Sequence, residues 1–262
     1  MAPFLYGSLA IYIISLILTI AGNISGRRRL LVVSMWAMAA GLVVHSAGLA
    51  VRMASTGHAP MASMDETLVF YGWTIVLVSL LVALRYRERL TELLTLPAAI
   101  AALAAGIAKL APGKPLTLIL KTRWFELHVI SSFAAYALFT LAFSGAVLYL
   151  VYERRTDEPS QSLLKRFEDL ANRAVLWGFF LFSLSMFSGA VWGYLAWGAY
   201  WMWEPKMLWS FIVWFYYAGA MHGYYVRDWR GKGLSIATVI GFIIVIFTYL
   251  GVSLLMKSSH SF

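Results

Sequence analysis

Long apolar stretches, separated by short polar connectors, occupy most of the chain. Each has about the length that a helix needs to cross the hydrocarbon core of a bilayer, about 20 residues. Strands of a membrane barrel would be shorter and would alternate in polarity, so we expect helices. The pattern predicts an all-α, polytopic membrane protein with about eight transmembrane helices, in which residues 1–262 form a single membrane domain. The stretches are Phe4 to Gly22, Leu30 to Val51, Thr67 to Leu84, Leu93 to Ala111, Phe125 to Tyr152, Ala174 to Leu195, Met207 to Val226 and Leu234 to Met256.

The composition strengthens the membrane prediction. Of the 262 residues, 61% are hydrophobic and 13% are charged, whereas a soluble domain is usually about half apolar and a quarter charged. This excludes an ordinary globular enzyme. The absence of cysteine excludes disulfides, iron–sulfur ligation, thiolate metal sites and a thiol nucleophile within the chain. The first stretch lacks a basic leader and a small-residue cleavage site, so we expect it to be a retained helix.

The net charge of +9 reflects topology rather than nucleic-acid binding. Most basic residues fall in alternate connectors, at Arg27, Arg28 and Arg29; Arg85, Arg87 and Arg89; Arg154, Arg155, Lys165, Arg166 and Arg173; and Arg227, Arg230 and Lys232. The positive-inside rule assigns these connectors to the cytoplasm and both termini to the external side. The longest of them has apolar residues at helical spacing, at Leu163, Leu164, Phe167 and Leu170, which suits an interfacial helix, and an ordinary surface helix also explains the spacing.

The connector after the sixth stretch is rich in tryptophan and is expected to form an external loop over residues 192–209. Six of the eleven tryptophans fall between Trp192 and Trp214, more than an interfacial aromatic belt explains. If the segment is helical, one stripe contains Trp197, Tyr200, Trp201 and Glu204, and Pro205 tends to end that turn. A flat aromatic surface with an acid at its edge suits a large planar apolar ligand, for which haem is the obvious candidate.

The decapeptide Trp197-Gly-Ala-Tyr-Trp-Met-Trp-Glu-Pro-Lys206 resembles the "WWD" signature of membrane proteins that handle haem in cytochrome c maturation, closest to the CcsA (ResC) family of System II. Further similarities are Gly57-His58-Ala-Pro60 with Asp65-Glu66, His128, His222 and Tyr249-Leu-Gly-Val252 before His260. Glu204 stands where the family usually has Asp, and Met207 where an acidic residue is common. The resemblance implies that haem b contacts Trp197, Gly198, Tyr200, Trp201, Trp203, Glu204, Pro205 and Lys206.

The histidines divide by position. His128 opens the fifth stretch on the external side, which favours a haem ligand, and the resemblance assigns the second axial ligand to His260 in the tail. His222 lies near the cytoplasmic end of the seventh stretch. His45 should lie about 24 Å from that side, against roughly 8 Å for His222, so the two cannot readily share a haem. We therefore expect His222 to take its second iron ligand from a partner protein. His45 is expected to be a core histidine and His58 to shape or gate the external loop.

The resemblance implies a haem-handling subunit of a cytochrome c synthase that acts with a CcsB-type membrane partner. It would present haem on the external side of a bacterial inner membrane or thylakoid to the Cys-x-x-Cys-His motif of apocytochrome c, with thiol-reducing proteins as further partners and no nucleic acid. The alternatives are a CcmC-like haem exporter or chaperone without ligation activity, a b-type membrane electron carrier, and a small-molecule transporter with an aromatic vestibule.

Overall fold

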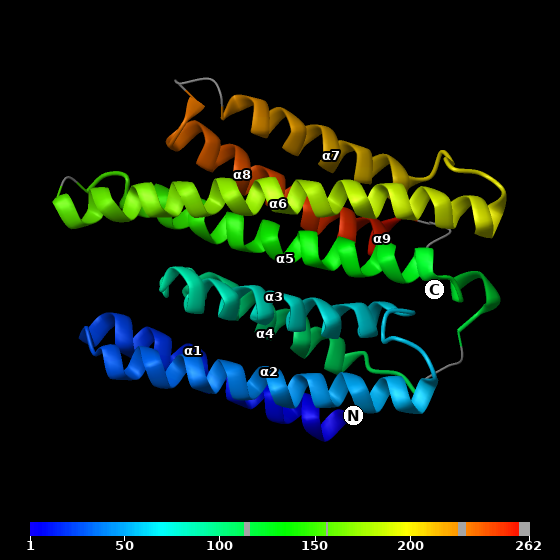
Figure 1. The fold of residues 1–262 in the computed structure, drawn as a ribbon, viewed down its shortest axis with the longest axis horizontal. Coiled ribbons are helices and arrows are strands. Elements are labelled where there is room, and N and C mark those ends of the chain that lie inside the picture. Colours follow the sequence, from blue (N-terminus) through cyan, green and yellow to red (C-terminus); the bar gives the residue numbers. More distant parts are fainter. Residues whose placement is uncertain (113–115, 156, 225–228, 257–262) are drawn as a thin grey trace. The chain divides into compact units, whose positions relative to one another are not determined.

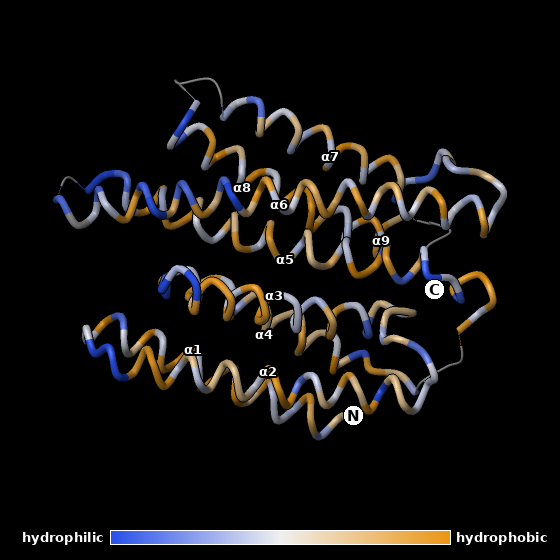
Figure 2. Tube along the Cα trace, viewed as in Figure 1, coloured by the Kyte–Doolittle hydropathy of each residue, from blue (hydrophilic) through white to orange (hydrophobic). Residues whose placement is uncertain are grey.

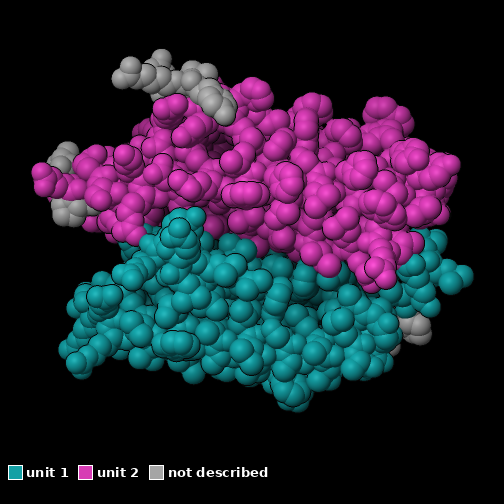
Figure 3. Space-filling model, viewed as in Figure 1, with its two compact units in different colours: residues 1–121 teal, residues 122–262 magenta. Residues whose placement is uncertain are grey.

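The structure is a computed structural model that describes all residues except 113–115, 156, 225–228 and 257–262 (Figure 1). Its described residues form helices and connectors, without a strand. This confirms the predicted all-α, polytopic fold class. The chain divides into two compact units, Met1–Lys121 and Thr122–Phe262, here called unit 1 and unit 2 (Figure 3). That residues 1–262 form a single membrane domain stays a prediction.

Unit 1 consists of four long helices and one short turn of 3-10 helix. They are α1 (Ala2–Ser25), α2 (Arg28–Thr56), α3 (Met64–Tyr86), α4 (Glu92–Ala108) and η1 (Leu118–Leu120). Small residues allow the helix backbones to approach closely, as is usual where lipid surrounds the helices. A Cβ atom on Gly41 of α2 would lie 2.6 Å from Cε1 of Tyr12 on α1, and one on Gly106 of α4 would lie 2.9 Å from the carbonyl oxygen of Asp65.

Buried ion pairs and hydrogen bonds join the helices of unit 1. Nε of Arg52 donates to Oε1 of Glu66 at 2.8 Å, and both side chains are buried. The other Glu66 oxygen accepts from the N–H of Ala62, while Asp65 accepts from the N–H of Ala111 at 3.2 Å. The pair Asp65-Glu66 therefore ties the start of α3 to the ends of α2 and α4. Because a buried carboxylate without partners is costly, these contacts explain why the acids are tolerated there.

Unit 2 contains the longest helix and an irregular C-terminal helix. Its elements are α5 (Arg123–Tyr152), α6 (Glu158–Trp197), α7 (Pro205–Gly223), α8 (Lys232–Ile246), the π-helical turn η3 (Phe247–Gly251) and α9 (Val252–Leu255). Helices α5 and α6 run antiparallel and in contact (Figure 1). Glycine permits this contact, because a Cβ atom on Gly178 of α6 would lie 2.7 Å from Cε1 of Phe139 on α5.

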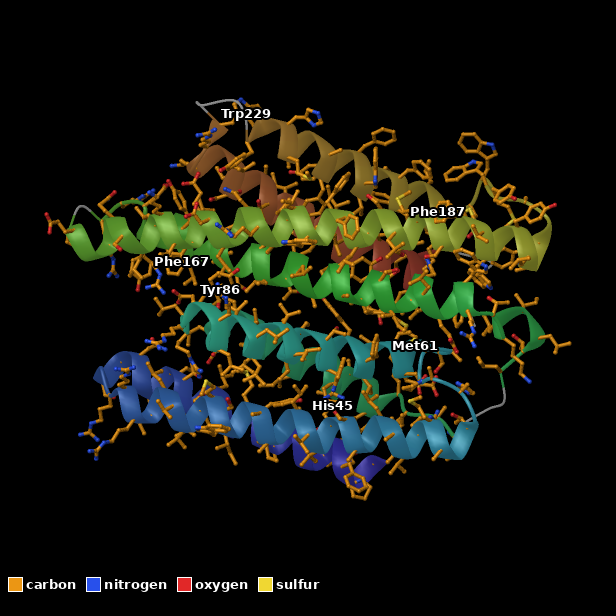
Figure 4. The ribbon with its side chains drawn as sticks, in the orientation of Figure 1. His45, Met61, Tyr86, Phe167, Phe187 and Trp229 are labelled. Atoms are coloured by element: carbon orange, nitrogen blue, oxygen red, sulfur yellow. The ribbon has the colours of Figure 1, made fainter. Side chains whose placement is uncertain are left out.

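Helix α6 begins earlier than its predicted membrane span. The expected interfacial helix around Phe167 and the span from Ala174 to Leu195 form one continuous helix. Phe167, which Figure 4 marks, is fully buried and lies edge-on to Tyr152 of α5 at 5.9 Å. The apolar stripe therefore faces α5 instead of a membrane surface, which corrects the interfacial prediction.

Six helices among the described residues are long and apolar enough to cross a membrane by length and composition. These are α1, α2, α3, α5, α6 and the helix that runs from Lys232 to Leu255. Helix α4 is apolar but shorter, and the 19-residue α7 does not belong to the six. Each of the eight predicted stretches thus contains a helix among the described residues, and six of these helices meet the criteria for a span.

The polar connectors gather at the ends of each unit (Figure 2). Within unit 1, the α1–α2 and α3–α4 connectors lie at the same end, and within unit 2 the α5–α6 and α7–α8 connectors do so too (Figure 1). These are the connectors in which the basic residues concentrate. The arrangement fits the alternation on which the positive-inside argument depends, and the side of the membrane that each end faces stays a prediction.

Candidate functional site

The tryptophan-rich segment contains the end of α6, an irregular loop and the start of α7. Helix α6 ends at Trp197 because Gly198 adopts a φ of 76°, a conformation that glycine favours, and donates its N–H to the carbonyl of Tyr194 at 2.9 Å. Residues 198–204 are not helical. Helix α7 then begins at Pro205, where the fixed φ of proline suits a first turn and its missing N–H leaves no bond unmade.

The irregular loop overturns the predicted helical arrangement of its aromatic residues. Pro205 starts a helix instead of ending a turn, and no helical stripe joins Trp197, Tyr200, Trp201 and Glu204. The rings pair individually instead. Tyr200 stacks on Tyr194 with ring centroids 4.4 Å apart and an interplanar angle of 10°. Trp201 lies edge-on to Phe211 at 4.6 Å and to Trp203 at 5.7 Å.

Two rings of the loop project from the unit in which they lie. Trp203 is 87% exposed and Tyr200 is 58% exposed. Large aromatic surfaces that are left open in this way suit either a headgroup region or a planar ligand. The loop is therefore one part of unit 2 that could bind a flat apolar molecule.

An acid and a base lie beside the aromatic rings at the start of α7. Glu204 occupies the position before the first helical residue, and its carbonyl accepts from the N–H of Leu208 at 3.1 Å. Burial lowers the pKa of Lys206 in the first turn of α7, and the Glu204 carboxylate offsets part of that shift. Met207 holds the loop from the same turn, because its sulfur accepts the N–H of Met202 at 3.2 Å. The loop therefore combines aromatic faces with an ammonium group that can attract a carboxylate.

His128 occupies the second turn of α5 and contacts α6. Its Nδ1 lies 2.8 Å from the carbonyl oxygen of Ser185 and 3.1 Å from the hydroxyl of that residue. A carbonyl can only accept, so Nδ1 carries a hydrogen. Nε2 is then the ring nitrogen that binds a metal when the imidazole is neutral.

Trp192 connects His128 to the tryptophan-rich segment. Its side chain is buried, and its ring stacks on the His128 imidazole at 6.1 Å with an angle of 22°. On another side it lies edge-on to Trp197 at 4.9 Å and contacts Phe125 at 5.1 Å. His128 and the start of the loop are thus brought together within unit 2 through one buried ring.

His222 lies in the last turn of α7, away from the loop. It is exposed, and its Nδ1 donates to the carbonyl of Ala218 at 2.7 Å. At 1.5 Å per residue, the helix separates it from Pro205 by about 25 Å. The structure therefore does not bring His222 to the aromatic loop, in agreement with its predicted separate role.

The other three histidines have different surroundings. His260 lies outside the described residues. His45 is fully buried in α2, and its Nδ1 lies 3.3 Å from the hydroxyl of Tyr12 (Figure 4). This burial fits the predicted core histidine. His58 is half-buried, and its Nδ1 donates to the carbonyl of Ala59 at 2.7 Å in the connector between α2 and α3.

Sequence reasoning did not identify the residues that hold the loop and His128 in place. Ser185, Gly189 and Trp192 follow one another at i, i+4 and i+7 on α6, so they share one face of the helix. That spacing was available in the sequence, but only the pairing of α6 with α5 reveals which residue the face contacts. Met207 was noted as a departure from the family, and its sulfur proves to hold the loop.

Comparisons with known proteins agree with this picture. The sequence model of the family described as Cytochrome C assembly protein matches residues 61–260. The class defined by fold and sequence is therefore a polytopic helical membrane protein of cytochrome c maturation. The cytochrome c biogenesis protein CcsA of Mesostigma viride is 30% identical, over 82% of this chain and 80% of that protein. CcsA of Porphyra purpurea is 28% identical, over 82% of each chain. The chain belongs to the CcsA family.

A solved structure has the same fold. Cytochrome c heme lyase CcmF aligns with a TM-score of 0.68 at 18% identity, over 98% of this chain and 46% of that protein. The chain thus spans less than half the length of CcmF, and at this identity the similarity concerns the fold alone.

Proposed function

We propose that the chain is the haem-handling subunit of a cytochrome c synthase of the System II type. It would present haem b to the Cys-x-x-Cys-His motif of apocytochrome c, where thioether bonds form. The observation that carries the proposal is the arrangement around His128. The His128 imidazole, whose Nδ1 donates to the Ser185 carbonyl, is held through Trp192 at the same end of unit 2 as a loop of exposed aromatic rings.

The donor chemistry of these residues fits haem. Imidazole nitrogen is an axial ligand of haem iron, aromatic rings contact the macrocycle, and the ammonium group of Lys206 can attract a propionate. His128 would bind iron from one face, and His260 is the proposed second ligand. The whole decapeptide from Trp197 to Lys206 would line the site, including Gly198, Trp203, Glu204 and Pro205. Bound haem would supply the vinyl groups to which the thiols add.

The share of this chain in the reaction is binding and orientation. The chain contains no cysteine, so both thiols must belong to the apocytochrome. Holding two reactants in a fixed geometry can remove several kcal/mol of entropic barrier, on the order of 7–11 kcal/mol in the best intramolecular cases. We therefore assign no acid–base role to Glu204, whose charge acts on Lys206.

The proposal extends to partners and membrane side. The exposed His222 can bind a haem iron from one side. The second ligand of that iron would come from another protein, and a CcsB-type subunit is the proposed partner. Thiol-reducing proteins would keep the substrate cysteines reduced. The aromatic loop and both termini would face the periplasmic or lumenal side of a bacterial inner membrane or thylakoid, because the basic connectors lie at the opposite end of each unit.

Purification of the chain with and without its partner tests the proposal. We expect a low-spin bis-histidine haem b spectrum on reduction. His128→Ala should lower haem content and holocytochrome yield, and added imidazole should restore part of both, since it replaces the missing nitrogen. Ser144→Ala, which removes a buried hydroxyl of α5 that bonds to the Thr140 carbonyl, is the control for the spectrum.

Two results would change the proposal. Haem-replete preparations without a Soret band, with and without the partner, would remove the haem-handling function. Haem that leaves on a carrier protein, without any thioether product in the presence of the partner and reduced apocytochrome, would instead support the CcmC-like exporter.

A further inference from the structure

The face of α6 that packs under His128 contains two small residues, Ser185 and Gly189. We propose that these are positioning residues, which fix the tautomer and the orientation of the His128 imidazole for iron ligation. The inference rests on the proposed function, because it assigns a task to residues around a proposed ligand. Neither residue belongs to the aromatic loop.

The Ser185 backbone determines where the imidazole carries its hydrogen. Its carbonyl oxygen lies 2.8 Å from Nδ1 of His128 and can only accept, so it selects the Nδ1–H tautomer. The Ser185 hydroxyl lies 3.1 Å from the same nitrogen and 3.2 Å from the His128 carbonyl oxygen. A metal-bound histidine commonly donates its other N–H to such a carbonyl, which raises the basicity of the ligating nitrogen.

Gly189 provides the space that the ring occupies. A Cβ atom at this position would lie 2.6 Å from Nδ1 and 2.8 Å from Cε1 of His128. The ring cannot yield toward Trp192 without disturbing the stacked contact at 6.1 Å. Any side chain at position 189 must therefore displace the imidazole or the backbone that holds it, and either shift disturbs the contact between Nδ1 and the Ser185 carbonyl.

The backbone of His128 is held as well as its ring. Its carbonyl oxygen accepts from the hydroxyl of Ser132 at 2.7 Å and from the hydroxyl of Ser131 at 3.2 Å, both on α5. The hydroxyls of Ser132 and Ser185 are also hydrogen-bonded to each other across the two helices. The His128 ring, the His128 carbonyl and the hydroxyls of Ser132 and Ser185 thus form one hydrogen-bonded network. The network fixes the orientation of the ring and therefore the direction in which Nε2 points.

Gly189→Ala, made in the full chain and purified with its partner, tests the space requirement. We expect haem retention to fall by about tenfold or more, as is typical when a second-shell contact to a metal ligand is lost. The low-spin spectrum should weaken, and added imidazole should restore it. Gly178→Ala is the matched control, because its Cβ would meet the Phe139 ring of α5 at 2.7 Å, at a site away from His128.

Ser185→Ala provides a second measurement if Gly189→Ala fails to accumulate. The substitution keeps the carbonyl and removes the hydroxyl, so the chain should fold and retain haem. The lost hydroxyl is a second acceptor for the Nδ1 hydrogen, 3.1 Å away, so its removal makes the imidazole less basic. A less basic imidazole stabilises ferric iron less, and we expect the midpoint potential of the bound haem to rise. Ser144→Ala is its control, since that buried hydroxyl bonds to the carbonyl of Thr140 on α5, away from His128.

The outcomes separate this inference from the proposed function. If His128→Ala changes the haem spectrum but Gly189→Ala behaves like Gly178→Ala, the positioning role is overturned and the ligand stands. If Gly189→Ala does not accumulate, a midpoint potential in Ser185→Ala equal to that in Ser144→Ala overturns the positioning role. An unchanged spectrum in His128→Ala removes the ligand itself, and with it the proposed site.

Discussion

Trp203 is the residue whose surroundings argue most directly for a ligand. Its side chain is 87% exposed and contacts Trp201 edge-on, so the fold gains little from it. If it anchors a membrane interface, neighbouring tryptophans can replace it. If it contacts haem, Trp203→Leu keeps apolar bulk but loses the flat surface. We expect normal protein levels with reduced haem content and reduced holocytochrome yield, measured as haem per folded protein and covalent product.

Trp177→Leu is the control for this substitution. Trp177 is 60% exposed in the middle of α6 and lies edge-on to Phe180. Both tryptophans are more than half exposed, but Trp177 lies away from the aromatic loop. Haem content at the wild-type level in both variants would contradict a role for Trp203 in the site and favour the interfacial belt.

At the scale of elements, the end of α6 determines the shape of the aromatic loop. Gly198 has a φ of 76° and ends the helix. Alanine there is strained by about 1 kcal/mol, because its Cβ clashes with the backbone in the left-handed conformation. Relief of that strain favours continued helix, which would rotate Tyr200 and the following rings away from their pairs. We therefore expect Gly198→Ala to lose haem content beyond what its small loss of stability explains.

Gly57→Ala separates strain from loop shape. Gly57 ends α2 with a φ of 74°, and a Cβ atom at either glycine would have nothing within 4 Å. The two variants should have similar unfolding temperatures, measured in detergent. Equal haem content in both would show that the conformation at Gly198 matters for stability alone.

The helices were predictable from hydropathy because lipid leaves backbone groups no partner outside the helix. A helix around Phe167 was also predictable from its apolar spacing, but its continuity with the following span was not, because its apolar residues become buried only against α5. The loop was misjudged for a different reason. Its aromatic spacing matched a helix, but α6 ends before the left-handed Gly198 and α7 begins only at Pro205, so the residues between them are not helical.

The candidate site was predictable only in its large side chains. Aromatic residues and histidines suggest chemistry wherever they occur, so His128 and Trp203 could be selected from the sequence. Ser185 and Gly189 could not, because a small residue has no signal until its neighbour is known. The contact between Gly189 and the His128 ring joins positions 61 residues apart, and it follows from the pairing of α5 with α6.

For the whole molecule, the decisive prediction concerns the side of the membrane that the connectors of each unit face. The chain has no cysteine, so a single introduced thiol reports its own location. Ser25 and Ser55 lie exposed near opposite ends of α1–α2 in unit 1, Ser162 is exposed near the start of α6, and Lys121 is exposed just before α5. The positive-inside rule places positions 25 and 162 in the cytoplasm and positions 55 and 121 outside.

In intact cells, we expect a membrane-impermeant maleimide to label Ser55→Cys and Lys121→Cys directly, and Ser25→Cys and Ser162→Cys only after permeabilisation. Wild-type chain gives the background. Reversed labelling in either unit would show that its basic connectors lie outside. Reversed labelling of Lys121→Cys and Ser162→Cys would show that the aromatic loop faces the cytoplasm, where it could not meet an external apocytochrome.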